Sequence, residues 1–223
     1  MKQFLLPSRT IVQFVIGAVL LVIVWVIVYG NLSRQKEASL RTSEARNLQQ
    51  WGIALNLYLI ENENQLPEVG GTPVTEEQKK AWYNVLPPYV SETSLAAIPP
   101  GQRPRPGEPS FWVRPTTKPV KIWDPQTFYF SYGMNRYLQP VETARSFRIH
   151  EIAYPGNVVF LVPVSGYTPA AVPETVVFSS DKEPEVPVLF CDGHVQTVKK
   201  SVLLAPGAHE AAAAAGGPSW FEK

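Results

Sequence analysis

Residues 11–29 read IVQFVIGAVLLVIVWVIVY, and almost every side chain in this stretch is apolar. Gln13 is the one strongly polar side chain among these nineteen residues. A helix needs about 20 apolar residues to cross a bilayer core about 30 Å thick. The apolar core of a removable signal peptide is usually shorter, about 7–15 residues. We therefore favour a retained transmembrane helix at 11–29 over a signal peptide, with a short leader at residues 1–10.

The charges around this span do not define its orientation. Two basic residues, Lys2 and Arg9, precede it, and four follow it: Arg34, Lys36, Arg41 and Arg46. The positive-inside rule counts lysines and arginines in the loops next to a span. Composition alone therefore leaves the orientation open.

A proline-free stretch extends the span. The chain has 22 prolines, but none lies between Ser8 and Leu66, and proline breaks helix interiors. Residues 30–66 therefore predict an amphipathic continuation of the helix; the alternative is a separate helix after a kink at Gly30. Gly52 interrupts the pattern at a cost of about 1 kcal/mol relative to alanine. Apolar residues at three- and four-residue steps form one stripe: Leu48, Trp51, Leu55, Tyr58 and Leu59. The expected solvent side carries Arg46, Gln49, Gln50 and Asn56.

Residues 67–204 predict a small α+β domain. Thr75-Glu76-Glu77-Gln78 is a capping-box pattern that predicts a helix through Trp82 and Val85. The strand candidates are 127–132, 158–164 and 175–178, followed by a hairpin in VPVLF-CDGH-VQTV. Its Asp192-Gly193 pair suits a two-residue turn with positive φ angles. Residues 205–223 are low in complexity and predict a disordered tail, in which we expect Trp220 and Phe221 to fray rather than dock.

Composition excludes some classes of function. The formal net charge is +1, so no basic surplus exists to bind nucleic acid. The single cysteine, Cys191, excludes an intrachain disulfide. The proline-rich segment 99–119 reads as a surface loop, with a polyproline II recognition segment as the alternative. Within it, Arg103 and Arg105 are the candidate partner contacts.

No motif in the sequence indicates catalysis, a metal or a cofactor. The chain lacks a GxSxG elbow and a phosphate-binding loop. The histidines are scattered, at His150, His194 and His209. Cys191, Asp192 and His194 invite a nucleophile–base interpretation, but adjacent strand residues point to opposite faces and the turn explains Asp-Gly. A calcium site is the alternative to an exposed acidic loop at Asp181, Glu183 and Glu185. We expect a non-enzyme.

Several segments in order resemble those of bacterial prepilin-like proteins, relatives of type IV pilins and type II secretion pseudopilins. They are the apolar span, LSRQKEASLRTSEARNLQQWGIALNLYLIENENQLP, WYNVLPPYV, SYGMNRYL, YPGNVVFL and FCDGHVQTV, within residues 8–200. The resemblance implies a lollipop fold, in which a long helix lies half in the inner membrane and half against a small antiparallel periplasmic sheet. It also implies a cytoplasmic N-terminus.

The resemblance places the prepilin cleavage point between Ser8 and Arg9. Prepilins usually have glycine before this point, phenylalanine or methionine after it, and glutamate at the fifth mature position. Here these positions are Ser8, Arg9 and Gln13. Gln13 avoids the cost of a charge in lipid. Relatives with the Asp192-Gly193-His194 hairpin motif often have histidine where this chain has Lys182, so no role is transferred to it.

Two functions follow as expectations. The first is a structural subunit, in a minor or tip position, of a pilus-like or type II-secretion-like assembly that packs against other pilin-like subunits through its helix. The second is an unprocessed, membrane-anchored periplasmic binding or scaffold domain with a pilin-like fold. For this second function, Arg103 and Arg105 would contact the partner.

Overall fold

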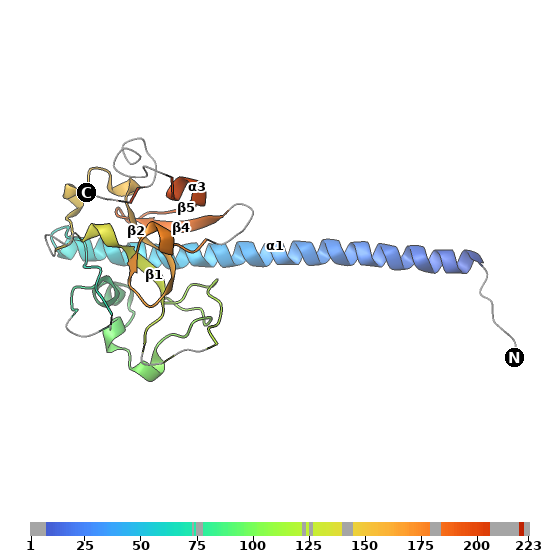
Figure 1. Ribbon diagram of the computed structural model, residues 1–223, viewed down its shortest axis with the longest axis horizontal. Coiled ribbons are helices and arrows are strands. Elements are labelled where there is room, and N and C mark those ends of the chain that lie inside the picture. Colours follow the sequence, from blue (N-terminus) through green and yellow to red (C-terminus); the bar gives the residue numbers. More distant parts are fainter. Residues whose placement is uncertain are drawn as a thin grey trace. The chain divides into compact units, whose positions relative to one another are not determined.

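The computed structural model describes residues 8–72, 74, 78–121, 124, 127–139, 145–178, 184–205 and 219–220. The chain divides into two compact units, Met1–Leu40 and Arg41–Lys223. Helix α1, Ser8–Glu61, contributes residues to both units and is drawn from blue to cyan in Figure 1. Its continuity through Gly30 confirms the prediction of one long helix and excludes a break there.

The first unit is the N-terminal part of α1. Its large apolar side chains from Val15 to Leu32 are about half exposed or more, and Leu21 reaches 72%. In the part of the chain that the structure describes, α1 is the one helix long and apolar enough to cross a membrane. The predicted span therefore lies on a helix that is long and apolar enough to cross a membrane.

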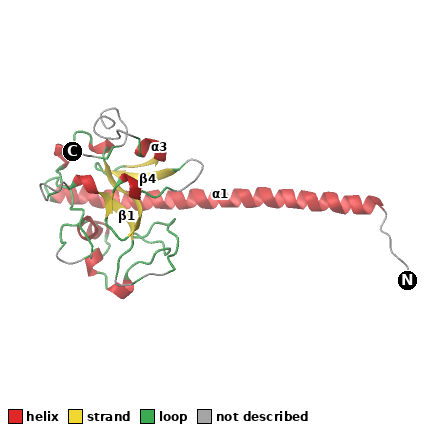
Figure 2. Cartoon of the chain, in the orientation of Figure 1, coloured by secondary structure: helices red, strands yellow, loops and turns green. Residues whose placement is uncertain are grey.

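The second unit contains a five-stranded sheet with the strand order β3-β1-β2-β4-β5. Its strands are drawn in yellow in Figure 2. The strands are β1 Phe130–Asn135, β2 Val159–Gly166, β3 Ala170–Ala171, β4 Glu185–Phe190 and β5 Val195–Lys199. Three neighbouring pairs are antiparallel, whereas β1 and β3 are parallel. The α+β prediction is confirmed, but the sheet is mixed rather than wholly antiparallel.

Short helices connect these strands and the long helix. The α-helical ones are α2 Trp82–Val85 and α3 Lys200–Leu203. The 3₁₀ turns are η1 Pro87–Val90, η2 Leu95–Ala97, η3 Pro100–Gln102, η4 Arg136–Leu138, η5 Ile149–Glu151, η6 Pro155–Asn157 and η7 Pro173–Thr175. Prolines at the first or second position of four of these turns have the fixed φ that a helical turn needs.

Two of the predicted elements are wrong in detail. Residues 175–178 form no strand, because η7 occupies Pro173–Thr175 and only Val177 N–H donates to the sheet, to Pro163 O at 3.0 Å. The predicted capping box lies outside the described residues at 75–77, and Gln78 is not helical. Helix α2 instead begins at Trp82, after Ala81 in an extended conformation.

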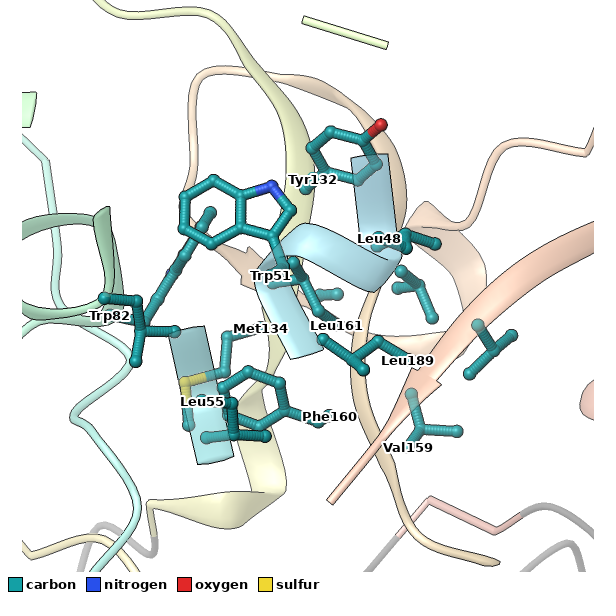
Figure 3. Close-up of a cluster of buried hydrophobic side chains, with 14 of the residues drawn as sticks. Leu48, Trp51, Leu55, Trp82, Tyr132, Met134, Val159, Phe160, Leu161 and Leu189 are labelled. Carbon is teal, nitrogen blue, oxygen red and sulfur yellow. The ribbon is translucent and has the colours of Figure 1, made fainter. Parts of the chain in front are cut away.

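The core forms between α1 and the sheet, as Figure 3 shows for Trp51 and its neighbours. All five residues of the predicted stripe are buried, with Leu48, Trp51 and Leu55 at 0% exposure. The Trp51 ring stacks on Phe111 at 4.0 Å between centroids, and Trp82 meets it edge-on at 5.2 Å. The predicted polar face is also confirmed, since Arg46, Gln49, Gln50 and Asn56 are exposed.

The predicted tail contains two residues that dock. Ser219 and Trp220 are each 1% exposed, and Ser219 forms a parallel bridge with Val158. The expectation that this end frays is therefore wrong for Trp220. Phe221 and residues 206–218 lie outside the described part of the chain.

Candidate functional site

Three large apolar side chains of α1 are exposed in the second unit. Ile53, Leu57 and Ile60 are 55%, 41% and 77% exposed. Steps of four and three residues place them on one side of the helix, opposite the buried Trp51 and Leu55. We call these three residues the outer ridge. A row of apolar side chains at this spacing is the kind of surface on which a second amphipathic helix packs.

The predicted leader and span residues lie at the start of α1. Ser8 is the first helical residue, and the side chains of Ser8 and Arg9 are outside the described part. Gln13 is exposed on the helix. It lies two residues before Val15, where the described exposed apolar side chains begin. The structure thus places these three residues on one helix without testing the cleavage that the family resemblance implies.

The Asp192-Gly193-His194 motif lies against α1 at its closest approach to the β4–β5 hairpin. A Cβ atom at Gly52 would lie 2.4 Å from Gly193 O and 3.0 Å from Leu189 Cδ1. A Cβ at Gly193 would lie 2.3 Å from Asn56 Nδ2. Glycine is therefore required at position 52 by the backbone of the turn, and at position 193 by its φ of +88° and the Asn56 side chain. This contact explains why a helix-weakening residue occupies position 52.

The turn itself differs from the predicted two-residue form. Phe190 N–H donates to His194 O and Gly193 N–H donates to Phe190 O, both at 3.0 Å, so the loop comprises Cys191, Asp192 and Gly193. Gly193 has φ +88°, whereas Asp192 does not have a positive φ. Three-residue hairpin loops typically place a glycine in the left-handed region after a tight turn. The predicted hairpin is confirmed, but its loop has three residues rather than the predicted two.

Asp192 and His194 stabilise the turn. Asp192 Oδ1 accepts the His194 N–H at 3.1 Å and lies 2.6 Å from His194 Nδ1. The imidazole stacks on the Phe190 ring at 4.5 Å with the planes 2° apart. Cys191 is buried with its thiol directed to Val159 O, and burial raises its pKa well above the usual value, as does Asp192 to a smaller extent. Cys191 is therefore poorly suited to act as a thiolate nucleophile with His194 as its base.

A buried ion pair joins α1 to the proline-rich segment. Arg114 Nη1 lies 3.2 Å from Glu44 Oε1, and Thr116 Oγ1 donates to Glu44 Oε2 at 3.2 Å. Glu44 is 1% exposed and Arg114 is 8% exposed. Burial raises the pKa of the Glu44 carboxyl, and Arg114 partly opposes that rise. The sequence analysis missed this pair, although Glu44 lies four residues before Leu48 and so extends the buried stripe.

The proline-rich segment is only partly a surface loop. Residues 111–114 are buried, so this part of the prediction is wrong; the apolar side chains of Phe111, Trp112 and Val113 account for the burial. Arg103 is half-buried and Arg105 is exposed beside the 3₁₀ turn η3. The two candidate contact residues therefore lie in the outer part of the segment.

Of the three acidic residues predicted to form an exposed loop, the structure describes only Glu185. Asp181 and Glu183 lie outside the described residues, as does Lys182. Glu185 lies on β4 and forms an ion pair with Arg41 of α1. Among the described residues, no group of three or more histidine, cysteine, aspartate or glutamate side chains could hold a metal. His150 lies on η5, and His209 is outside the described part.

No family model matches the chain, and neither the curated proteins nor the solved structures yield a match. The resemblance to prepilin-like proteins therefore rests on the order of the motifs and stays a prediction.

Proposed function

We propose that this chain is a membrane-anchored structural subunit of a pilus-like or type II-secretion-like assembly and that it acts by helix packing rather than catalysis. The observation that carries the proposal is the exposure of apolar side chains on α1. They cover its membrane-length part and recur as the outer ridge in the second unit. Ile60 at 77% exposure gains by packing against a neighbouring helix, because that contact removes its apolar surface from water.

The partners in this proposal are other pilin-like subunits and the inner membrane. The first unit would span the membrane, with residues 1–10 in the cytoplasm and the second unit in the periplasm. The orientation is supported by the resemblance to prepilin-like proteins. Gln13 favours a minor or tip position, because a neutral amide forms only neutral hydrogen bonds where the family's glutamate pairs with a neighbour's amine.

The outer ridge provides the first test. We expect Ile60→Lys to abolish co-purification with pilin-like partners after mild detergent extraction from native membranes. The variant should remain folded, since surface substitutions usually change stability by less than about 0.5 kcal/mol. Val120→Lys adds the same charge at an exposed valine outside the outer ridge, 37% exposed, and should co-purify normally. Equal recovery of partners with the two variants would contradict a packing role for the ridge.

Processing provides the second test. Intact mass and N-terminal sequencing of the protein from native membranes would locate its mature start. A start at Arg9, with or without an added methyl group, supports a processed subunit. A start at Met1 contradicts processing at Ser8 and favours the alternative below.

The alternative is an unprocessed, anchored periplasmic binding or scaffold domain. The observation in its favour is Arg105, an exposed cation in the outer part of the proline-rich segment. Deleting residues 101–109 should then abolish capture of a partner while the domain keeps its fold. Retained capture in a folded deletion variant would remove this alternative.

A further inference from the structure

The described end of the chain occupies a binding site on the second unit. Ser219 N–H donates to Asn157 O at 2.7 Å, and Val159 N–H donates to Ser219 O at 3.0 Å. These two bonds form the parallel bridge to Val158. Ser219 therefore binds as an added strand residue at the start of β2.

The chain leaves this place open because β1 ends early. The last antiparallel pair between β1 and β2 is Met134 with Leu161. Asn135 Nδ2 then donates to Val159 O at 2.9 Å, which satisfies that carbonyl without a further strand residue. On the other side of β2, Cys191 N–H donates to Val158 O at 2.9 Å. The remaining edge groups at positions 157 and 159 are those that Ser219 uses.

Trp220 supplies the side-chain part of the site. It is 1% exposed, and its Nε1 donates to Leu203 O at 3.3 Å, at the last residue of α3. A buried indole with a hydrogen-bonded N–H combines a large apolar area with a directional contact. Two backbone bonds and one aromatic pocket are the elements of peptide recognition by strand addition.

A segment of thirteen residues, 206–218, connects this docked end to α3. It reads PGAHEAAAAAGGP. A chain of that length spans at most about 45 Å, which is comparable to the diameter of a compact domain of this size, about 40 Å. A segment of this length can therefore reach the same site on a copy that packs directly alongside.

We propose that the site beside Val158 also accepts Ser219–Trp220 from a neighbouring copy of this chain, so that copies held close together exchange their ends. The contacts are identical in the two arrangements, as in domain swapping. The two arrangements differ in free energy only by the cost of closing residues 206–218 onto their own chain. A tethered group typically has an effective concentration of about millimolar, so exchange requires copies whose local concentration approaches that value. The inference rests on the membrane anchor of the proposed function, which holds copies close together, and not on filament formation.

Disulfide trapping tests the exchange in full-length protein reconstituted at high density in phospholipid vesicles. One chain carries Val158→Cys and a second, differently tagged chain carries Ser219→Cys. Residues paired on neighbouring strands lie about 4.7–4.9 Å apart, within the range of about 4.4–6.8 Å between Cα atoms that a disulfide needs. After mild oxidation, we expect a disulfide-linked heterodimer on a non-reducing gel.

Four controls make the result specific. A Val120→Cys chain mixed with the Ser219→Cys chain should give no heterodimer, and chains with only the buried Cys191 set the background. Adding Trp220→Ala to the Ser219→Cys chain should remove the heterodimer, since the indole pocket is then empty. A chain with both Val158→Cys and Ser219→Cys should form an intrachain disulfide when diluted in detergent micelles.

Each outcome decides the proposal. A Trp220-dependent heterodimer supports exchange. An intrachain disulfide in the double variant without any heterodimer in vesicles overturns it, because the end then binds only its own chain. Failure of the intrachain disulfide in a folded double variant also overturns it, because the docked geometry is then wrong. Loss of partner co-purification in Ile60→Lys would leave the disulfide result unchanged, so the two proposals fail separately.

Discussion

Replacing Gly52 with alanine adds one methyl group at the contact between α1 and the β4–β5 hairpin. In an open helix position this change is stabilising, because alanine is favoured over glycine by about 0.8–1 kcal/mol. Here the new Cβ would lie 2.4 Å from Gly193 O, a backbone atom, and 3.0 Å from Leu189 Cδ1. Because Gly193 O belongs to the backbone, the clash cannot be relieved by rotating a side chain, and the turn or the helix has to move.

The size of the effect follows from these opposing contributions. Overpacking a tight site costs about 1–3 kcal/mol, and a backbone contact of 2.4 Å belongs in the upper half of that range. Subtracting the helix-propensity gain of about 1 kcal/mol leaves a net destabilisation of about 1–2 kcal/mol. For a domain of 150–250 residues, each kcal/mol lowers Tm by about 2–4 °C.

The assay is thermal unfolding of the full chain in detergent micelles, followed by near-ultraviolet circular dichroism of the aromatic core around Trp51. Gly101→Ala is the matched control, because a Cβ at Gly101 meets no atom within 4 Å. We expect a lower Tm for Gly52→Ala and an unchanged or slightly higher Tm for Gly101→Ala. A Tm increase in Gly52→Ala would refute the argument that the hairpin turn requires glycine at this position.

Three further substitutions test other contacts. Glu44→Ala leaves Arg114 buried without its carboxylate partner and should lower the free energy of unfolding, measured with denaturant, by about 3–5 kcal/mol. A decrease below about 1 kcal/mol would show that the pair is solvated. Hydrogen bonds from Arg145 lower the pKa of Glu151 from 4.5 to about 2. This pair therefore stabilises the fold fully above about pH 4.5 and progressively less as the pH falls toward 2. Glu151→Gln should make Tm less dependent on pH between these two values. A Tm–pH curve identical to that of the unsubstituted protein would contradict the pairing. Trp220→Ala should cost about 3–5 kcal/mol in denaturant unfolding, and an unchanged midpoint would mean that the indole is not part of the core.

Local patterns were sufficient to predict the helix and its buried side. The absence of proline between Ser8 and Leu66 and the spacing of Leu48, Trp51 and Leu55 are properties of the sequence itself. The hairpin was also predictable, but its loop length was not. Whether Phe190 pairs with His194 depends on the register of β4 and β5, which the contact with Gly52 helps to define.

Contacts between distant positions account for what the sequence did not reveal. Glu44 and Arg114 are separated by 70 residues, and Trp220 meets Leu203 across the low-complexity segment. Neither pair forms a local motif, so no pattern singled out Glu44, and Trp220 was expected to fray. The outer ridge was present in the sequence as Ile53, Leu57 and Ile60, at the same spacing as the buried stripe. The spacing of the buried stripe predicted the side of the helix that the sheet covers, whereas the second apolar row on the opposite side was not noted.

The close approach at Gly52 bears on how the Asp-Gly-His motif should be interpreted. Gly193 has the positive φ and lies against the helix, and Asp192 holds the His194 N–H and ring. A Cβ at Gly156 would lie 2.9 Å from Asp192 Oδ2, so the η6 turn is packed against the carboxylate as well. Asp192 and His194 thus shape the hairpin turn, and Gly193 allows that turn to pack against α1. Because the outer ridge lies on the opposite side of that helix from the buried stripe, a firm attachment of the sheet also determines how the ridge is presented to a partner.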